Sequence, residues 1–102
     1  MIIISSGDLL CNVSNTIRDA NGEPVFIMKY CQVKYVLVDP KKKSVTNTAT
    51  ITEFRHYPAR VYKKIENNEE NCITLFLGSS PFATLMTLDA YNKEFGENQA
   101  LN

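Results

Sequence analysis

One short segment holds the residues that could do acid–base chemistry. Residues 53–64 read EFRHYPARVYKK and contain His56, the only histidine among the 102 residues. Because imidazole changes charge near neutral pH, a Cys–His or Ser–His mechanism would have to use it. No GxSxG or cysteine-protease signature links it to the candidate nucleophiles, which are Cys31, Cys72, Ser79 and Ser80. The sequence therefore predicts a protein that is not an enzyme, and no catalytic residue is assigned.

The three cysteines give no framework for a metal or for disulfides. Cys11, Cys31 and Cys72 are widely spaced, no CxxC pair occurs, and the odd number leaves one thiol unpaired. Zinc sites need ligands at short spacings, and small disulfide-rich domains need an even number of cysteines. A GxxxxGK[ST] loop for a nucleotide is also missing from the sequence. We therefore expect reduced thiols in a cytoplasmic protein that carries no metal and no cofactor.

Positive charge is concentrated in the middle of the chain, although the whole protein has a net charge of zero. Residues 29–64 hold nine cations and two acids, a net charge of +7, and the remainder carries −7. Aromatic residues alternate with these cations, and this mixture is typical of surfaces that bind anionic partners. The predicted partner-binding residues are Lys29, Lys34, Lys41, Lys42, Lys43, Arg55, Tyr57, Arg60, Tyr62 and Lys64.

This charge distribution predicts a small non-enzymatic binding protein whose basic and aromatic middle engages an anionic partner. An acidic protein surface is favoured, because the nine acids elsewhere would repel a phosphate backbone if they lie nearby. A single-stranded nucleic-acid binder is the first alternative. The size and the Asn, Lys and Ile content would suit an accessory protein of a virus or mobile element, such as an inhibitor of a host protein. No membrane partner is expected, because the apolar run in MIIISSGD is too short for a membrane span or a signal peptide.

The elements that position these residues are predicted to be mostly strands. Hydrophobic patterning indicates strands near residues 2–5, 9–18, 25–38, 45–54, 60–65 and 72–77. A helix over 9–18 would also place Leu9, Val13 and Ile17 on one side. Its Asn, Ser and Thr residues are poor in helix interiors, however, so a strand is favoured there. The sequence shows no internal repeat.

The basic segment itself is predicted to lie at an edge of the sheet. Pro58 cannot donate a hydrogen bond to a neighbouring strand, so the chain should leave the sheet or reach an edge there. When the strand resumes at 60–65, Arg60, Tyr62 and Lys64 share one face, and Lys63 lies on the other. The segment is therefore expected to form the rim of a binding surface.

The C-terminal part is predicted to be one helix over residues 81–95. Ser80 can cap its N-terminus, Pro81 suits the first helical position, and Gly96 suits the end. Apolar side chains would cover more than half of this helix, which is wider than a helix on a sheet requires. A structural or assembly subunit that forms homo-oligomers is therefore the second alternative, with Phe82 and Met86 as interface residues.

The predicted fold class is α+β. We expect a mainly antiparallel sheet of five or six strands, in one form curled into a small barrel, with one C-terminal helix. A chain of 102 residues, of which 44% are apolar, has the size and composition of one domain. Residues 1–96 are expected to form this domain, and residues 97–102 a frayed C-terminal tail.

Overall fold

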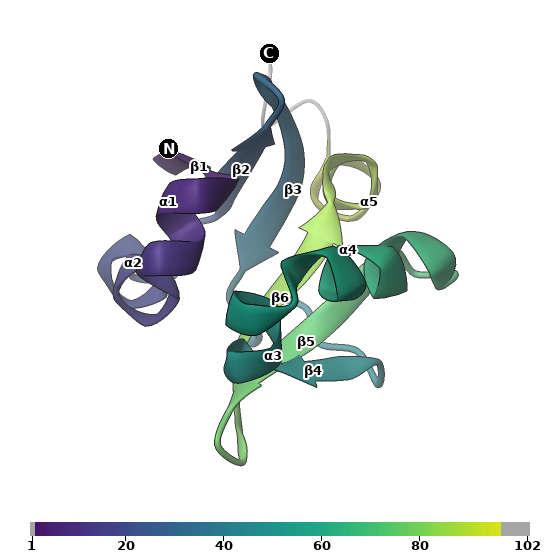
Figure 1. The fold of residues 1–102 in the computed structure, drawn as a ribbon. Coiled ribbons are helices and arrows are strands. Elements are labelled where there is room, and N and C mark those ends of the chain that lie inside the picture. The colour runs from purple at the N-terminus through teal and green to yellow at the C-terminus, as the bar shows by residue number, and fades with distance from the viewer. Residues whose placement is uncertain (1, 97–102) are drawn as a thin grey trace.

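Six strands form one open sheet in the computed structural model, which describes residues 2–96 (Figure 1). The strand order is β1-β2-β3-β6-β5-β4. The two outer pairs are parallel and the three inner pairs are antiparallel, so the sheet is mixed. In chain order the elements are β1 (Ile2–Ser5), α1 (Ser6–Cys11), α2 (Val13–Ala20), β2 (Val25–Lys29), β3 (Gln32–Val38), β4 (Thr48–Thr50), α3 (Ile51–His56), α4 (Pro58–Asn67), β5 (Cys72–Leu77), β6 (Ser80–Thr87) and α5 (Leu88–Phe95).

The α+β class and a sheet of six strands are confirmed, and the finer prediction is corrected. The sheet does not close into a barrel, because β1 and β4 lie at its two opposite edges. Five helices accompany it within residues 2–96, where one was predicted. The predicted tail, residues 97–102, lies outside the described residues.

Helices cover both faces of the sheet. On one face, α1–α4 bury Leu9, Phe54 and Ile65 against the strands in the larger core. On the other face, α5 packs Tyr91 beside Phe26 in a smaller core. The central strands β3 and β6 therefore have buried residues on both sides, which explains why their sequences are apolar at every position over 35–38 and nearly so over 83–86.

The fold repeats one β-α-α-β-β unit, first over residues 2–38 and then over residues 48–87. In both units a hydroxyl at the end of the first strand caps the first helix: Ser5 Oγ accepts from the Asp8 N–H, and Thr50 Oγ1 accepts from the Glu53 N–H. In each hairpin the pairing register shifts by one residue directly before the last two residue pairs. The shift lies between Ile27 and Met28 in β2 and between Leu75 and Phe76 in β5. Both turns between the helices have the same backbone shape, with φ −144° and ψ 47° at residue 12 and φ −134° and ψ 61° at residue 57.

A pseudo-twofold axis relates the two units and passes between Leu37 and Leu85. The register of the two hairpins makes each residue of β2 and β3 equivalent to the residue 48 positions later. Leu37 pairs with its own equivalent, Leu85, across the central β3–β6 ladder. The two hairpins consequently point to opposite ends of the molecule, while both helix pairs lie on the same face (Figure 1).

The predicted strands at 9–18 and 60–65 are wrong, because both segments are helices. Their core-facing residues follow helical spacing, with Val13, Ile17 and Ala20 in α2 and Val61 and Ile65 in α4. Burying one such side chain contributes about 1.5–3 kcal/mol, whereas a poor helix former costs at most about 0.7 kcal/mol. Pro58 does not end a strand but begins α4, where its missing N–H costs nothing.

Two further predicted boundaries are wrong. Residues 25–38 form a hairpin instead of one strand, because the chain turns at Tyr30 and Cys31, which both have left-handed φ values of 55° and 64°. Of residues 45–54, only Thr48–Thr50 are a strand, and α3 follows at once.

The predicted helix over 81–95 is half strand and half helix. Pro81 lies in β6 opposite Phe76, near the start of the strand, where a missing N–H is tolerated. The helix α5 begins only after Thr87, whose Oγ1 accepts from the Ala90 N–H. The apolar residues cover too much of the predicted helix because some of them belong to β6, which buries side chains on both faces of the sheet.

We predict that the Tyr30→Asn, Cys31→Gly double variant is more stable than the wild type. The left-handed conformation costs a residue with a side chain about 1–2 kcal/mol, and Asn-Gly is the typical sequence of such two-residue turns. The free energy of unfolding from urea denaturation should rise by about 1–2 kcal/mol. The matched control is Gly78→Ala in the other hairpin, where φ is 64° and an added Cβ meets no atom within 4 Å, so any loss comes from the backbone alone. A double variant that is no more stable than the wild type would show that the turn is unstrained.

Candidate binding surface

An open groove between helix α4 and edge strand β4 is lined by cations and amides. Its volume is about 580 Å³, and none of its lining residues is an acid. Ammonium, guanidinium and amide N–H groups are all hydrogen-bond donors, so the groove offers donors to a carboxylate or a phosphate. We call it the basic groove, and it consists of Asn47, Thr48, Arg60, Lys63, Lys64, Asn67, Asn68 and Ile73.

Helix α4 brings the cations of the basic groove together by its periodicity. Arg60, Lys63, Lys64 and Asn67 stand at positions i, i+3, i+4 and i+7, which share one face of a helix. A strand would have separated Lys63 from the other two cations, and the strand prediction therefore missed it. A helical reading of residues 58–67 would have identified this face.

Two stacked tyrosines hold α4 against the sheet. The rings of Tyr35 and Tyr62 lie 4.2 Å apart between centroids at an angle of 21°. The Tyr35 hydroxyl donates to a carboxylate oxygen of Glu66, and the Tyr62 and Ser6 hydroxyls are hydrogen-bonded at 3.1 Å. Lys29 Nζ lies 4.6 Å from the centre of the Tyr62 ring. Tyr62, which was predicted at a binding surface, is only 4% exposed and supports the groove from below.

These two tyrosines stay uncharged over a wide range of pH. Burial raises the pKa of Tyr35 far above its usual value, and the hydrogen bond and negative charge of Glu66 raise it further. Burial also raises the pKa of Tyr62, with a smaller opposing effect from the Ser6 hydrogen bond. Neither tyrosine therefore adds a charge to the α4 surface.

The cations around the groove have different neighbours. Lys64 Nζ pairs with Glu53 at 3.1 Å, in an exposed ion pair that solvent weakens. The Arg60 guanidinium carbon lies 4.7 Å from the centre of the Tyr57 ring, which is 56% exposed. Lys63 has no ion-pair partner within the described residues, so its charge is available to a ligand.

The structure gathers some of the predicted binding residues and separates others. Tyr57, Arg60 and Lys64 lie on one helical surface, whereas Arg55 lines a small depression beside the α1–α2 junction. Lys29 and Lys34 belong to the β2–β3 hairpin. The remaining three follow β3 in a lysine turn, which consists of Lys41, Lys42 and Lys43.

Lys43 of the lysine turn packs on the other face of the sheet, whereas Lys41 lines a pocket beside α2. The backbone carbonyl of Lys43 accepts a hydrogen bond from Thr84 Oγ1. The Nζ atom of Lys43 forms an ion pair with Glu94 of α5 at 3.2 Å. The predicted interface residue Met86 is also on this face, 1% exposed in the smaller core, while Phe82 is half-buried on β6. Both residues were predicted to lie on an apolar helix over residues 81–95, but both lie in strand β6.

The residues considered for catalysis lie on separate elements. His56 is exposed at the last turn of α3, and the structure gives it no hydrogen bond within residues 2–96. Cys72 is buried at the start of β5, and Cys31 is exposed at the β2–β3 turn. None of the helices in residues 2–96 is long and apolar enough to span a membrane.

Comparisons of the chain with protein-family models, with curated proteins and with solved structures find no match. Its function is therefore inferred from the geometry of the basic groove.

We predict that alkaline pH destabilises the protein through Tyr35, and that Tyr35→Phe reduces this effect. In the unfolded chain a tyrosine ionises near pH 10, whereas Glu66 and burial keep Tyr35 protonated in the fold. The unfolded state therefore loses its proton first, and the free energy of unfolding falls as pH rises above about 10. Urea denaturation at about pH 8 and pH 11 measures this fall for both proteins. If the wild type and Tyr35→Phe lose the same stability, the Tyr35–Glu66 contact is not the cause.

Proposed function

We propose that this chain is a small binding protein that engages an acidic surface of a partner protein through the basic groove. The observation that carries this proposal is the composition of the groove, in which three cations and three amides line one hollow without an acid among them. It acts by covering its partner and performs no chemistry on it. An accessory protein that inhibits its partner would work in this way.

The shape of the groove favours a peptide surface with separate carboxylates. The cations project from helix α4, and Thr48 of the edge strand β4 and Asn47 just before it line the groove with them. Ile73 lies at the floor of the groove and is only 1% exposed, so the cations and amides are the groups that a ligand can contact. Charge at such a surface contributes mainly to the rate and orientation of association.

The aromatic residues favour a protein over a single-stranded nucleic acid. Single-strand binders stack bases on exposed rings. Of the three Phe and Tyr rings in residues 53–64, two are buried, since Phe54 is 0% and Tyr62 is 4% exposed. The third, Tyr57, already has the guanidinium of Arg60 against its ring. A row of free stacking rings beside the basic groove is therefore not formed.

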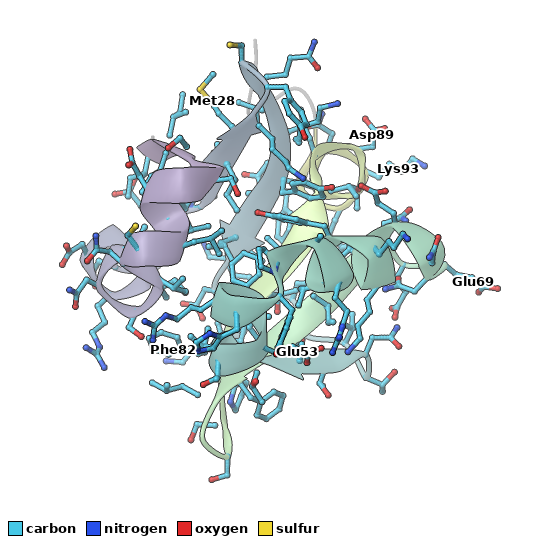
Figure 2. All side chains as sticks on the ribbon, viewed as in Figure 1. Met28, Glu53, Glu69, Phe82, Asp89 and Lys93 are labelled. Atoms are coloured by element: carbon cyan, nitrogen blue, oxygen red, sulfur yellow. The ribbon has the colours of Figure 1, made fainter. Side chains whose placement is uncertain are left out.

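Acidic residues beyond the end of α4 limit the direction in which a partner can lie. Figure 2 shows Glu69 projecting outward beyond the last turn of this helix, and Glu70 follows it in the same turn. Like charges repel an acidic ligand, so a partner is directed toward Arg60 and away from Glu69.

We predict that Arg60→Glu with Lys63→Glu removes binding of an acidic ligand. The probe is a fluorescein-labelled poly-glutamate peptide, and its affinity is measured by fluorescence anisotropy at low and at moderate salt. Two charge reversals in the groove should weaken binding by at least about tenfold, which corresponds to about 1.4 kcal/mol. The matched control is Lys34→Glu with Lys42→Glu, which changes the net charge equally at exposed positions outside the groove and should leave binding nearly unchanged.

Three outcomes would contradict the proposal. Equal losses in the groove variant and in the control would mean that net charge alone attracts the peptide. If the wild type did not bind poly-glutamate even at low salt, the basic groove would not be a site for acidic ligands. If oligo-dT bound more tightly than poly-glutamate and only the groove variant lost it, the ligand would be a nucleic acid. Capture from the native host with the wild type, the control and the groove variant then identifies the partner as the protein that the groove variant alone fails to retain.

A further inference from the structure

A second pocket lies between helix α2 and the sheet, at the end of the molecule where Figure 2 labels Phe82. Its volume is about 280 Å³. Its walls are apolar and come from α2, β2, β3 and β6, and they consist of Ile17, Ala20, Val25, Leu37, Phe82 and Ala83. Charged side chains of both signs stand at its rim, and they are Arg18, Glu23, Asp39 and Lys41.

The pseudo-twofold axis shows what this pocket lacks. Ala83 in β6 is the equivalent of Tyr35 in β3, because the two hairpins align with an offset of 48 residues. Ile17 in α2 is the equivalent of Tyr62 in α4, because the two helix pairs align with an offset of 45 residues. Tyr35 and Tyr62 stack on each other and fill their half of the molecule. Alanine and isoleucine leave the corresponding space open.

We propose that this pocket binds one tyrosine side chain of a partner protein. A cavity of about 150 Å³ holds a benzene molecule, so 280 Å³ accommodates a phenol ring. It is slightly smaller than the pockets that hold drug-sized ligands, which start at about 300 Å³. A single ring is therefore the ligand that fits.

The rim can satisfy the hydroxyl of the tyrosine and its neighbours in sequence. In the equivalent half of the molecule, a carboxylate of Glu66 accepts the Tyr35 hydroxyl. The rim of the open pocket likewise carries a carboxylate, that of Asp39. The Arg18 guanidinium carbon lies 5.9 Å from the centre of the Phe82 ring, where it can meet an acidic residue next to the tyrosine. A buried aromatic anchor with a polar rim is the usual form of an energetic hot spot.

This inference does not rest on the basic groove, because no residue lines both hollows. The two hollows can therefore be tested separately: loss of groove binding leaves the tyrosine pocket intact, and loss of the pocket leaves the groove intact.

The test uses p-cresol, which is the side chain of tyrosine, in a titration followed by ¹H–¹⁵N NMR spectroscopy. Saturable shifts confined to the pocket residues are expected. The variant Ala83→Tyr supplies the missing ring from the chain itself and should abolish these shifts while it raises the melting temperature. Ala83→Leu is a second variant that fills part of the pocket if the tyrosine prevents folding, and it should weaken p-cresol binding.

Tyr35→Ala is the matched control, because it opens the equivalent space in the other half. It should gain a second p-cresol site beside Tyr62 and keep the first one. The inference is overturned if p-cresol causes no saturable shift up to its solubility limit, or if the shifts persist unchanged in Ala83→Tyr.

Two further measurements identify the source of the tyrosine. The peptide acetyl-Glu-Tyr-Glu-amide should bind more tightly than p-cresol if the tyrosine belongs to a protein, and weaker binding of the peptide would point to a free phenol instead. Tyr30, which is 84% exposed, could also enter the pocket of a second copy. Light scattering that shows self-association in the wild type and none in Tyr30→Ala would overturn the proposal of a different partner protein.

Discussion

The central pairing of β3 with β6 is the interaction on which the rest of the structure depends. It joins two units that each have one edge strand, one helix pair and one hairpin, and neither unit covers its own inner edge. At its centre Leu37, which is 2% exposed, lies opposite Leu85, which is 0% exposed. Since strands in the middle of a sheet need apolar residues on both faces, the pairing requires helices on both sides. The four helices of the repeat cover one face, and α5 with the lysine turn covers the other.

The position of α4 follows from this pairing, and the basic groove follows from the position of α4. One side of the helix carries Tyr62, whose ring stacks on Tyr35 of the first unit's β3. This contact joins the two units a second time, above the sheet. The opposite side of the helix then faces the sheet edge, where Asn47 precedes the short strand β4 and Thr48 begins it. Because Tyr62 holds one side of α4 against the core, the three cations on the other side of α4 must point toward the groove.

The fold class and the charged middle segment could be predicted from the sequence, but the architecture could not. Runs of β-branched and aromatic residues identified most strands. The segment containing Val61 and Ile65, however, fits a strand and a helix equally well over six residues. Only contacts with distant strands decide between them, because burial outweighs local propensity. The hairpin turn at Tyr30 and Cys31 carries no glycine or asparagine signal, so its left-handed backbone could not be predicted locally. The repeat could not be recognised in the sequence, because equivalent positions of the two units share burial and hydrogen bonding but have different residue types.

The differences between the two units separate what the fold needs from what a ligand needs. Caps, register shifts and core positions recur in both units, so the fold accounts for them. The cations of the basic groove do not recur: with an offset of 45, the equivalents of Arg60, Lys63 and Lys64 are Asn15, Arg18 and Asp19. The three cations carry +3, whereas their equivalents on the same surface of α2 carry no net charge. The fold therefore does not require this charge, and the stacked tyrosines show the same asymmetry on the inner side of the helices. Because a unit can fold with either set of residues, this difference supports the proposal that the cations of the basic groove recognise a ligand.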